Sequence, residues 1–214
     1  MSFNYLLFVI WILLSCCLTR PNRSEGSDAT PPSNLTKDQE IELATSGAPE
    51  YLRKDSAVYV LEASKYALAR HGSNGITCIV FRDSADSSEP ICYDEEGARS
   101  NMMADIKRSE LRKQGVSEKE IAEKIQEAYK TGELQAPKRS GVAYMLSDRN
   151  FIFNPEGKAQ HYPPHLMFYA PYLKNSDIGA RKEEFGSTAV PWVLSEGTPE
   201  AYIIVVPGGE SHQH

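Results

Sequence analysis

The sequence lacks the short motifs that would assign it to a common class of enzyme. It contains no glycine-rich phosphate-binding pattern, no Gly-x-Ser-x-Gly turn, no His-Glu-x-x-His motif and no Cys-x-x-Cys pair. It also has no long basic run, and its formal net charge is -6 at pH 7. This charge argues against nucleic acid and against anionic membrane surfaces as partners. Two function classes remain to be weighed, a binding module and a small enzyme without a recognisable motif.

Charge is also absent from the start of the chain, where residues 3–19 are mostly apolar. A membrane span needs about 20 apolar residues, so this run fits the core of an export signal better. The segment Leu13-Leu14-Ser15-Cys16 has the form of a bacterial lipoprotein signal, which is cleaved before a cysteine that becomes lipidated. No Lys or Arg precedes the apolar core, so an uncleaved membrane anchor is the alternative. We predict export to the cell envelope, or periplasm, with Cys16 lipidated and the chain membrane-anchored.

Cysteine is scarce, with four residues in the chain. Cys16 and Cys17 belong to the N-terminal segment, whereas Cys78 and Cys92 lie in two apolar stretches. An exported protein meets an oxidising compartment, which allows the second pair to form a disulfide. The alternative is two buried free thiols, which are common in protein cores. We predict a Cys78–Cys92 disulfide, because its loop of about 15 residues would stabilise the fold by about 3 kcal/mol.

The length of 214 residues fits one domain behind a leader. Residues 1–19 form the signal or lipoprotein-type segment, and residues 20–35 form a disordered tether rich in Ser, Pro and charge. Residues 36–207 are predicted to fold as a single globular domain, and residues 208–214 form a tail.

The globular part shows strand signals, then helix signals, then strand signals again. Thr36 and Gln39 predict a capping box for a helix that ends near Gly47. Ser73-Asn74-Gly75 predicts a hairpin turn between strands at 66–70 and 76–81. Other predicted strands cover 57–61, 141–146, 150–153, 165–170 and 201–206, and predicted helices cover 96–114 and 117–132. This order predicts an α+β fold, a mainly antiparallel sheet with an antiparallel helical hairpin packed on one face.

Two histidines, His161 and His165, flank a pair of prolines. Prolines exclude a helix there, and extended geometry would place the two Cα atoms roughly 12 Å apart. A shared metal therefore requires a turn and a third ligand such as Asp148 or Glu156. A metal site at His161 and His165 is the basis of the alternative function, a small metal-dependent or hydrolase-like enzyme. The simpler interpretation is structural, with one histidine hydrogen-bonded at the sheet edge. The sequence assigns no cofactor.

A second role is open to His165. On an extended strand His165, Met167 and Tyr169 share one face, because side chains alternate along a strand. With Tyr144 or Tyr202 nearby, they would line an aromatic ligand-binding or acid–base pocket. The alternative is an ordinary half-buried aromatic face of the sheet.

The charged residues elsewhere are interpreted as surface. Asp83, Asp86 and Glu89 are of the type that binds calcium, but their spacing matches no known loop, so a solvated acidic turn is predicted. The charges of the helical region are predicted to form a solvated face; they are Lys107, Arg108, Glu110, Arg112, Lys113, Lys119, Glu123 and Lys124.

Four segments together resemble a group of exported bacterial proteins with no assigned activity. They are the lipoprotein-like start, Asn-Gly-Ile-Thr-Cys-Ile-Val at 74–80, Pro-Ile-Cys-Tyr at 90–93 and Pro-His-Leu-Met-Phe at 164–168. The similarity spans about residues 45–206 and implies an envelope location and one domain, without catalytic residues. We therefore expect an exported, membrane-tethered protein that binds a small molecule or a protein.

Overall fold

The computed structural model describes residues 34–84, 87–153, 159–184 and 186–207. The predicted signal segment with Cys16, nearly all of the predicted tether, and the tail lie outside these residues. Within the described ranges, no helix is both long enough and apolar enough to cross a membrane.

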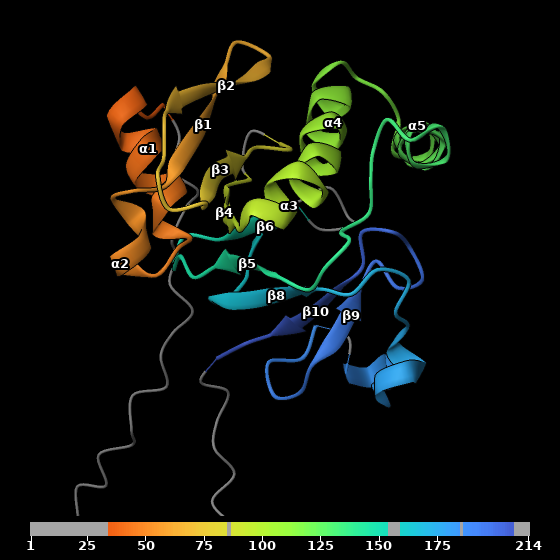
Figure 1. The fold of residues 1–214 in the computed structure, drawn as a ribbon. Coiled ribbons are helices and arrows are strands. Elements are labelled where there is room, and N and C mark those ends of the chain that lie inside the picture. The colour runs from red at the N-terminus through yellow and green to blue at the C-terminus, as the bar shows by residue number, and fades with distance from the viewer. Residues whose placement is uncertain (1–33, 85–86, 154–158, 185, 208–214) are drawn as a thin grey trace, which may run out of the picture.

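The described chain forms an α+β domain around one large sheet (Figure 1). The helices are α1 (Lys37–Ser46), α2 (Glu50–Arg53), α3 (Glu95–Arg99), α4 (Asn101–Lys113) and α5 (Glu118–Thr131), with short 3-10 helices η1 (Asn175–Ile178) and η2 (Lys182–Glu184). The main sheet contains β1 (Ala57–Glu62), β2 (Lys65–Arg70), β3 (Thr77–Phe81), β4 (Glu89–Tyr93), β5 (Val142–Met145), β8 (His165–Tyr169), β9 (Trp192–Leu194) and β10 (Tyr202–Val205). A separate small sheet contains β6 (Phe151–Phe153) and β7 (Ala159–His161).

The eight strands lie in the order β2-β1-β3-β4-β5-β8-β10-β9. Neighbouring strands are antiparallel except for the pair β1 and β3. The predicted α+β fold with a mainly antiparallel sheet is therefore confirmed.

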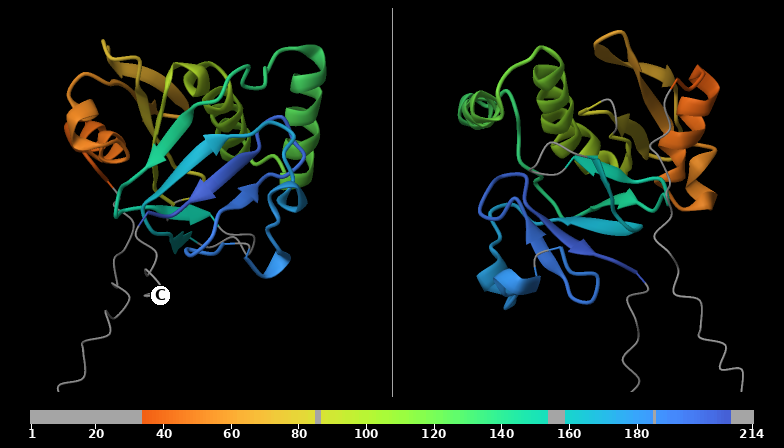
Figure 2. Two further views of the ribbon diagram at one scale, coloured as in Figure 1. Left: turned by 60° about the horizontal axis from the view of Figure 1, so that its bottom comes forward. Right: turned by 180° about the vertical axis from the view of Figure 1, so that it is seen from behind.

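The alternation of side chains along β3 shows how the sheet is covered. Ile79 and Phe81 join the hydrophobic cluster that includes Met102 of α4, whereas Cys78 and Val80 join the cluster under α1. The strand is apolar in both alternating sets because helices cover both of its faces. Farther along the sheet, the left view of Figure 2 looks onto β5, β8, β10 and β9 with α4 behind them. Phe168 of β8 lies on the opposite side from α4 and is 39% exposed.

Helices α4 and α5 follow one another on one face of the sheet, as predicted, joined by a short turn. Ser117 and Glu120 form the expected capping box of α5, and Gly132 ends that helix with φ at 79°. The stripe of Ile121, Ile125 and Ala128 packs against Ala104 and Leu111 of α4, so α4 lies between α5 and the sheet. Figure 1 looks along α5 but across α4, so the two helices cross steeply and the predicted antiparallel arrangement is wrong.

The hairpin predicted between residues 66–70 and 76–81 is also wrong. Strand β2 pairs with β1, where Glu62 lies opposite Lys65, and β3 pairs with the other edge of β1 in a parallel register. The connection from β1 to β2 is only two residues long, and Ala63 adopts φ of 55° there. Such a short connection forces the two strands it joins into a hairpin.

The predicted disulfide joins two neighbouring strands of the main sheet, β3 and β4. Cys78 of β3 lies directly opposite Cys92 of β4, and the two sulfur atoms are bonded. Both residues are fully buried under α1. The alternative of two free thiols does not hold in this structure.

Candidate ligand-binding cavity

A cavity of about 700 Å³ lies on the α4 side of the main sheet. Its floor is built by inward-facing side chains of five neighbouring strands, from β3 to β10, and by edge strand β9. Helix α4 and the small sheet contribute the other walls. The apolar lining residues are Phe81, Ile91, Met145, Ile152, Met167, Trp192, Leu194 and Ile204, with Tyr162 and Tyr202 adding aromatic rings. A cavity of this size and lining is typical of sites for small organic molecules.

Helix α4 places an ion-pair network along one wall. Arg108 donates to Oδ1 of Asp105 at 2.8 Å and to Oε1 of Glu200 at 2.6 Å. The hydroxyl of buried Tyr93 donates to the other oxygen of Asp105 at 2.8 Å. One guanidinium is therefore shared by two carboxylates, and all three charged groups line the cavity.

The electrostatics of this wall follow from burial. Burial raises the pKa of Asp105 to about 6, the charge of Glu200 adds to the rise, and the charge of Arg108 opposes it. Burial alone would lower the pKa of Arg108, but the charges of Asp105 and Glu200 outweigh it and raise that pKa. Arg108 therefore stays charged, whereas Asp105 changes its protonation near pH 6.

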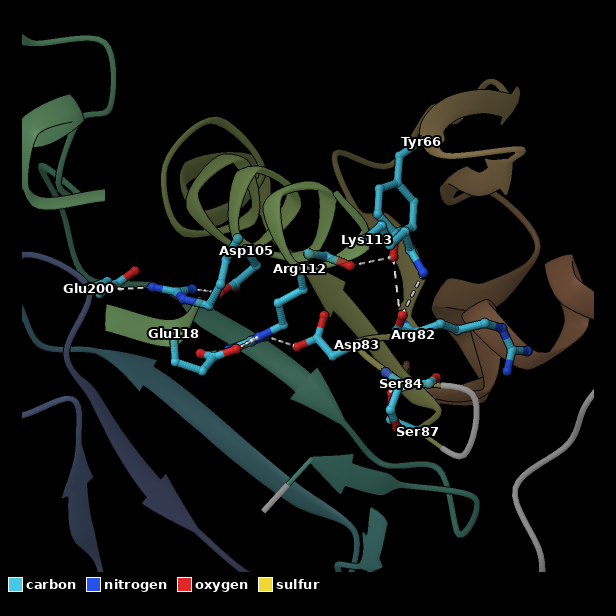
Figure 3. A network of polar contacts seen from close by, with 12 residues as sticks. Tyr66, Arg82, Asp83, Ser84, Ser87, Asp105, Arg112, Lys113, Glu118 and Glu200 are labelled. Carbon is cyan, nitrogen blue, oxygen red and sulfur yellow. Dashed lines mark hydrogen bonds and ion pairs between the residues drawn. The ribbon is translucent and has the colours of Figure 1, made fainter. Parts of the chain in front are cut away.

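A second arginine of α4 completes the network (Figure 3). Arg112 donates to Asp83, which follows β3, and donates from Nε to Glu118 at 2.6 Å. The side chains of Asp83 and Arg112 are only 12% and 15% exposed. Neighbouring Lys113 turns away and donates to the carbonyl of Arg82 at 2.7 Å.

His165 lies at the start of β8 and lines the same cavity. Its Nδ1 is 2.9 Å from the carbonyl oxygen of Pro163, which must be an N–H donation because a carbonyl only accepts. Burial lowers the pKa of His165, although the bond to Pro163 opposes this, so the ring is neutral at pH 7. The ring therefore presents Nε2 as a hydrogen-bond acceptor.

His161 lies elsewhere. Its side chain is exposed, its Nε2 is 2.9 Å from the carbonyl oxygen of Asp148, and it does not line the cavity. No group of three or more His, Cys, Asp or Glu side chains that could hold a metal occurs among the described residues. Glu156, one of the third ligands considered, lies outside them. The metal site at His161 and His165 therefore stays a prediction, as does the enzyme proposed on it. The described residues supply no third ligand for such a site.

The two histidines should respond differently to substitution. His165→Ala should lower the free energy of unfolding by about 1–3 kcal/mol, because it removes a buried, hydrogen-bonded ring. His161→Ala should change it by less than about 0.5 kcal/mol, as is usual at exposed positions. Urea unfolding of both variants measures the difference. Equal losses, reproduced in the parent protein by a chelator, would contradict this asymmetry and support a shared metal.

The aromatic pocket predicted around β8 differs in part from the cavity. His165 and Met167 line it together with Tyr202. Tyr169 shares their buried face, but its hydroxyl donates to the carbonyl of Val142 at 2.9 Å and it does not reach the cavity. Tyr144 lies on the opposite face of the sheet, in the cluster under α1.

The polar residues of the cavity are the ones that sequence reasoning misplaced. Asp83 and Glu89 were expected in a solvated turn, but both line the cavity; Asp86 lies outside the described residues. Arg108 and Arg112 were expected on a solvated face, yet they are 22% and 15% exposed. The sequence did contain a signal for the position of Arg112. Asp105, Ser109 and Arg112 follow the buried Met102 at helical spacing, so they lie on the same face of α4, the face that packs on the sheet.

Comparisons of the chain with models of protein families, with curated proteins and with solved structures found no match. The functional argument therefore depends on the cavity itself. Its chemistry combines a broad apolar floor, a charged wall and one neutral imidazole acceptor.

Proposed function

We propose that this protein is an exported, membrane-tethered envelope protein that binds a small, largely apolar organic molecule in the cavity beside α4. The export part of the proposal is supported by the uncharged apolar start, the lipoprotein-like Ser15-Cys16, and the resemblance to exported bacterial proteins. The buried Cys78–Cys92 disulfide is consistent with an oxidising compartment. Nucleic acid is not expected as a partner.

The observation that carries the binding proposal is the composition of the cavity wall. Side chains from six strands of the main sheet, from α4 and from the small sheet converge on a space of about 700 Å³ with a mostly apolar lining. The space is partly open to solvent, and it is distinguished by its apolar lining rather than by its volume. A space of this size, lined by a few convergent polar groups, is the usual form of a ligand site.

Tryptophan fluorescence provides a direct test, because the chain has two tryptophans and Trp192 lines the cavity. In full-length protein carrying Trp11→Phe, titration with phenylbutanol should shift the emission of Trp192 in a saturable way. Leu194→Phe should weaken this binding at least about tenfold, because the larger side chain occupies the cavity.

Leu166→Phe is the matched control, since Leu166 belongs to β8 but does not line the cavity. It should leave the affinity for phenylbutanol unchanged. An unsaturable response, or equal weakening by Leu194→Phe and Leu166→Phe, would refute binding in this cavity. Circular dichroism of each variant confirms that the fold is retained.

Lipidation predicts a defined mature N-terminus. Protein recovered from the membrane fraction of the source cell should begin at Cys16 and carry added acyl mass, because cleavage precedes the lipidated cysteine. Intact-mass spectrometry decides, and Cys16→Ser should leave the chain unprocessed. Recovery of parent protein that still begins at Met1 would favour the uncleaved anchor instead.

A further inference from the structure

We infer that the molecule held in this cavity is a cation, an amine that is protonated at neutral pH and attached to an apolar body. The inference rests on the proposed function, because it specifies the chemistry of the ligand for the same cavity. Three observations support it: the excess of acidic over basic groups along the wall, the ion pairs that both arginines already make, and the free Nε2 acceptor of His165.

Among the described residues that line the cavity and whose ion pairs are given above, acidic groups outnumber basic groups. The carboxylates of Asp83, Asp105 and Glu200 face the guanidinium groups of Arg108 and Arg112, which leaves a formal excess of one negative charge. Charges interact more strongly in a partly buried site than in water. The excess therefore favours a bound cation and opposes a bound anion.

The arginines that would otherwise attract an anion already have carboxylate partners. Arg108 bonds Asp105 and Glu200, and Arg112 bonds Asp83 and Glu118. A carboxylate or phosphate ligand would have to compete with these internal ion pairs. Because each carboxylate has two oxygens with several lone pairs, Glu200 can accept from a ligand while it keeps Arg108.

The neutral groups of the cavity also suit an N–H donor. His165 offers the lone pair of Nε2, since its Nδ1 hydrogen is used by Pro163. The rings of Trp192, Tyr162 and Tyr202 line the same space. Aromatic faces attract ammonium groups through their quadrupole, and they also pack against an apolar ligand body.

Three probes of matched shape test the charge preference. Phenylbutylamine, phenylbutanol and phenylbutyrate differ at one terminal group, which is cationic, neutral or anionic at pH 7.5. Calorimetric titration of the full-length protein in detergent should give an affinity for the amine about tenfold higher than for the alcohol, and the acid should bind weakest. A charge-assisted hydrogen bond is worth roughly this factor.

Two variants locate the preference. Glu200→Gln should reduce the advantage of the amine over the alcohol at least about threefold, and Arg108 keeps its bond to Asp105. Glu133→Gln is the control, because Glu133 is 59% exposed, pairs with Lys107 and does not line the cavity. It should leave both affinities unchanged. Asp105→Asn provides a second test at the same wall if the Glu200 variant does not fold.

The outcomes separate the inference from the proposed function. If the amine binds no tighter than the alcohol, or if the acid binds tightest, the cationic preference is overturned while binding in the cavity stands. If the preference survives all substitutions at Glu200 and Asp105, the cation is not held by this wall, and the inference is overturned as well. If none of the three probes binds, the proposed function fails together with it.

Discussion

Replacing Cys78 and Cys92 together with alanine should lower the free energy of unfolding by about 3 kcal/mol, one of the two largest effects that we expect. The bond closes a loop with a sequence separation of 14 residues, and it limits the unfolded chain to fewer conformations. Both cysteines are fully buried between β3, β4 and α1, so lost packing adds to the effect. Urea unfolding of parent and double variant measures the difference.

Reductant provides the control for this experiment. When reductant is added to the urea, the free energy of unfolding of the parent should fall, because its unfolded chain is then no longer cross-linked. The free energy of unfolding of the double variant should not change. Thiol labelling of denatured, non-reduced parent protein should find neither Cys78 nor Cys92 free. Labelling of both would contradict the disulfide, and it would also weaken the argument for export.

The second large effect concerns the pH dependence of stability at Asp105. Its pKa rises from 3.8 to about 6 on folding, so the folded protein binds this proton more tightly than the unfolded chain. Stability is therefore lost as pH rises from about 4 to about 6. Because each pKa unit corresponds to about 1.4 kcal/mol, the loss is about 3 kcal/mol. Asp105→Asn should gain about this amount relative to the parent between pH 4 and pH 7.5.

Unfolding of the two proteins at both pH values isolates the Asp105 contribution. His165 acts in the opposite direction, because its lowered pKa makes stability fall as pH falls below about 6.5, but it is common to both proteins. The groups that face Asp105 are likewise common, namely Tyr93, Arg108, Glu200, Asp83 and Tyr202. A difference between parent and variant that does not change with pH would show that the pKa of Asp105 is unshifted.

A carboxylate that lowers stability at neutral pH is typical of functional sites, where local groups are not optimised for folding. Asp105 fits this description, because two acids share Arg108 at the wall of the proposed ligand site. The pH experiment therefore bears on function as well as on stability.

The parts of the fold that the sequence predicted are those set by neighbouring residues. The capping boxes at Thr36 and Ser117 act within one helical turn, and both were found in place. The alternation along β8 correctly placed His165 and Met167 on one face, because that period is local as well.

The parts that the sequence did not predict depend on distant partners. Ser73-Asn74-Gly75 has turn chemistry, but β2 pairs with β1 because their connection is shorter. Strand β9 is only three residues long, which is too short for an alternating pattern to be recognised in the sequence. It forms because β10 pairs with it. Arg112 of α4 resembles any solvated helix charge until the fold brings Asp83 to it from the loop after β3.

The position of α5 on α4, rather than on the sheet, has a consequence for motion. Its apolar stripe is anchored mainly to a neighbouring helix, so its opening free energy should be lower than that of the central strands, with faster amide hydrogen exchange. Glu118, the first residue of α5, bonds Arg112 at the cavity wall. Each local opening of this helix would therefore release the Glu118 carboxylate from Arg112 while Asp83 stays bonded to it, so the charge beside the ligand site would fluctuate with the opening of α5.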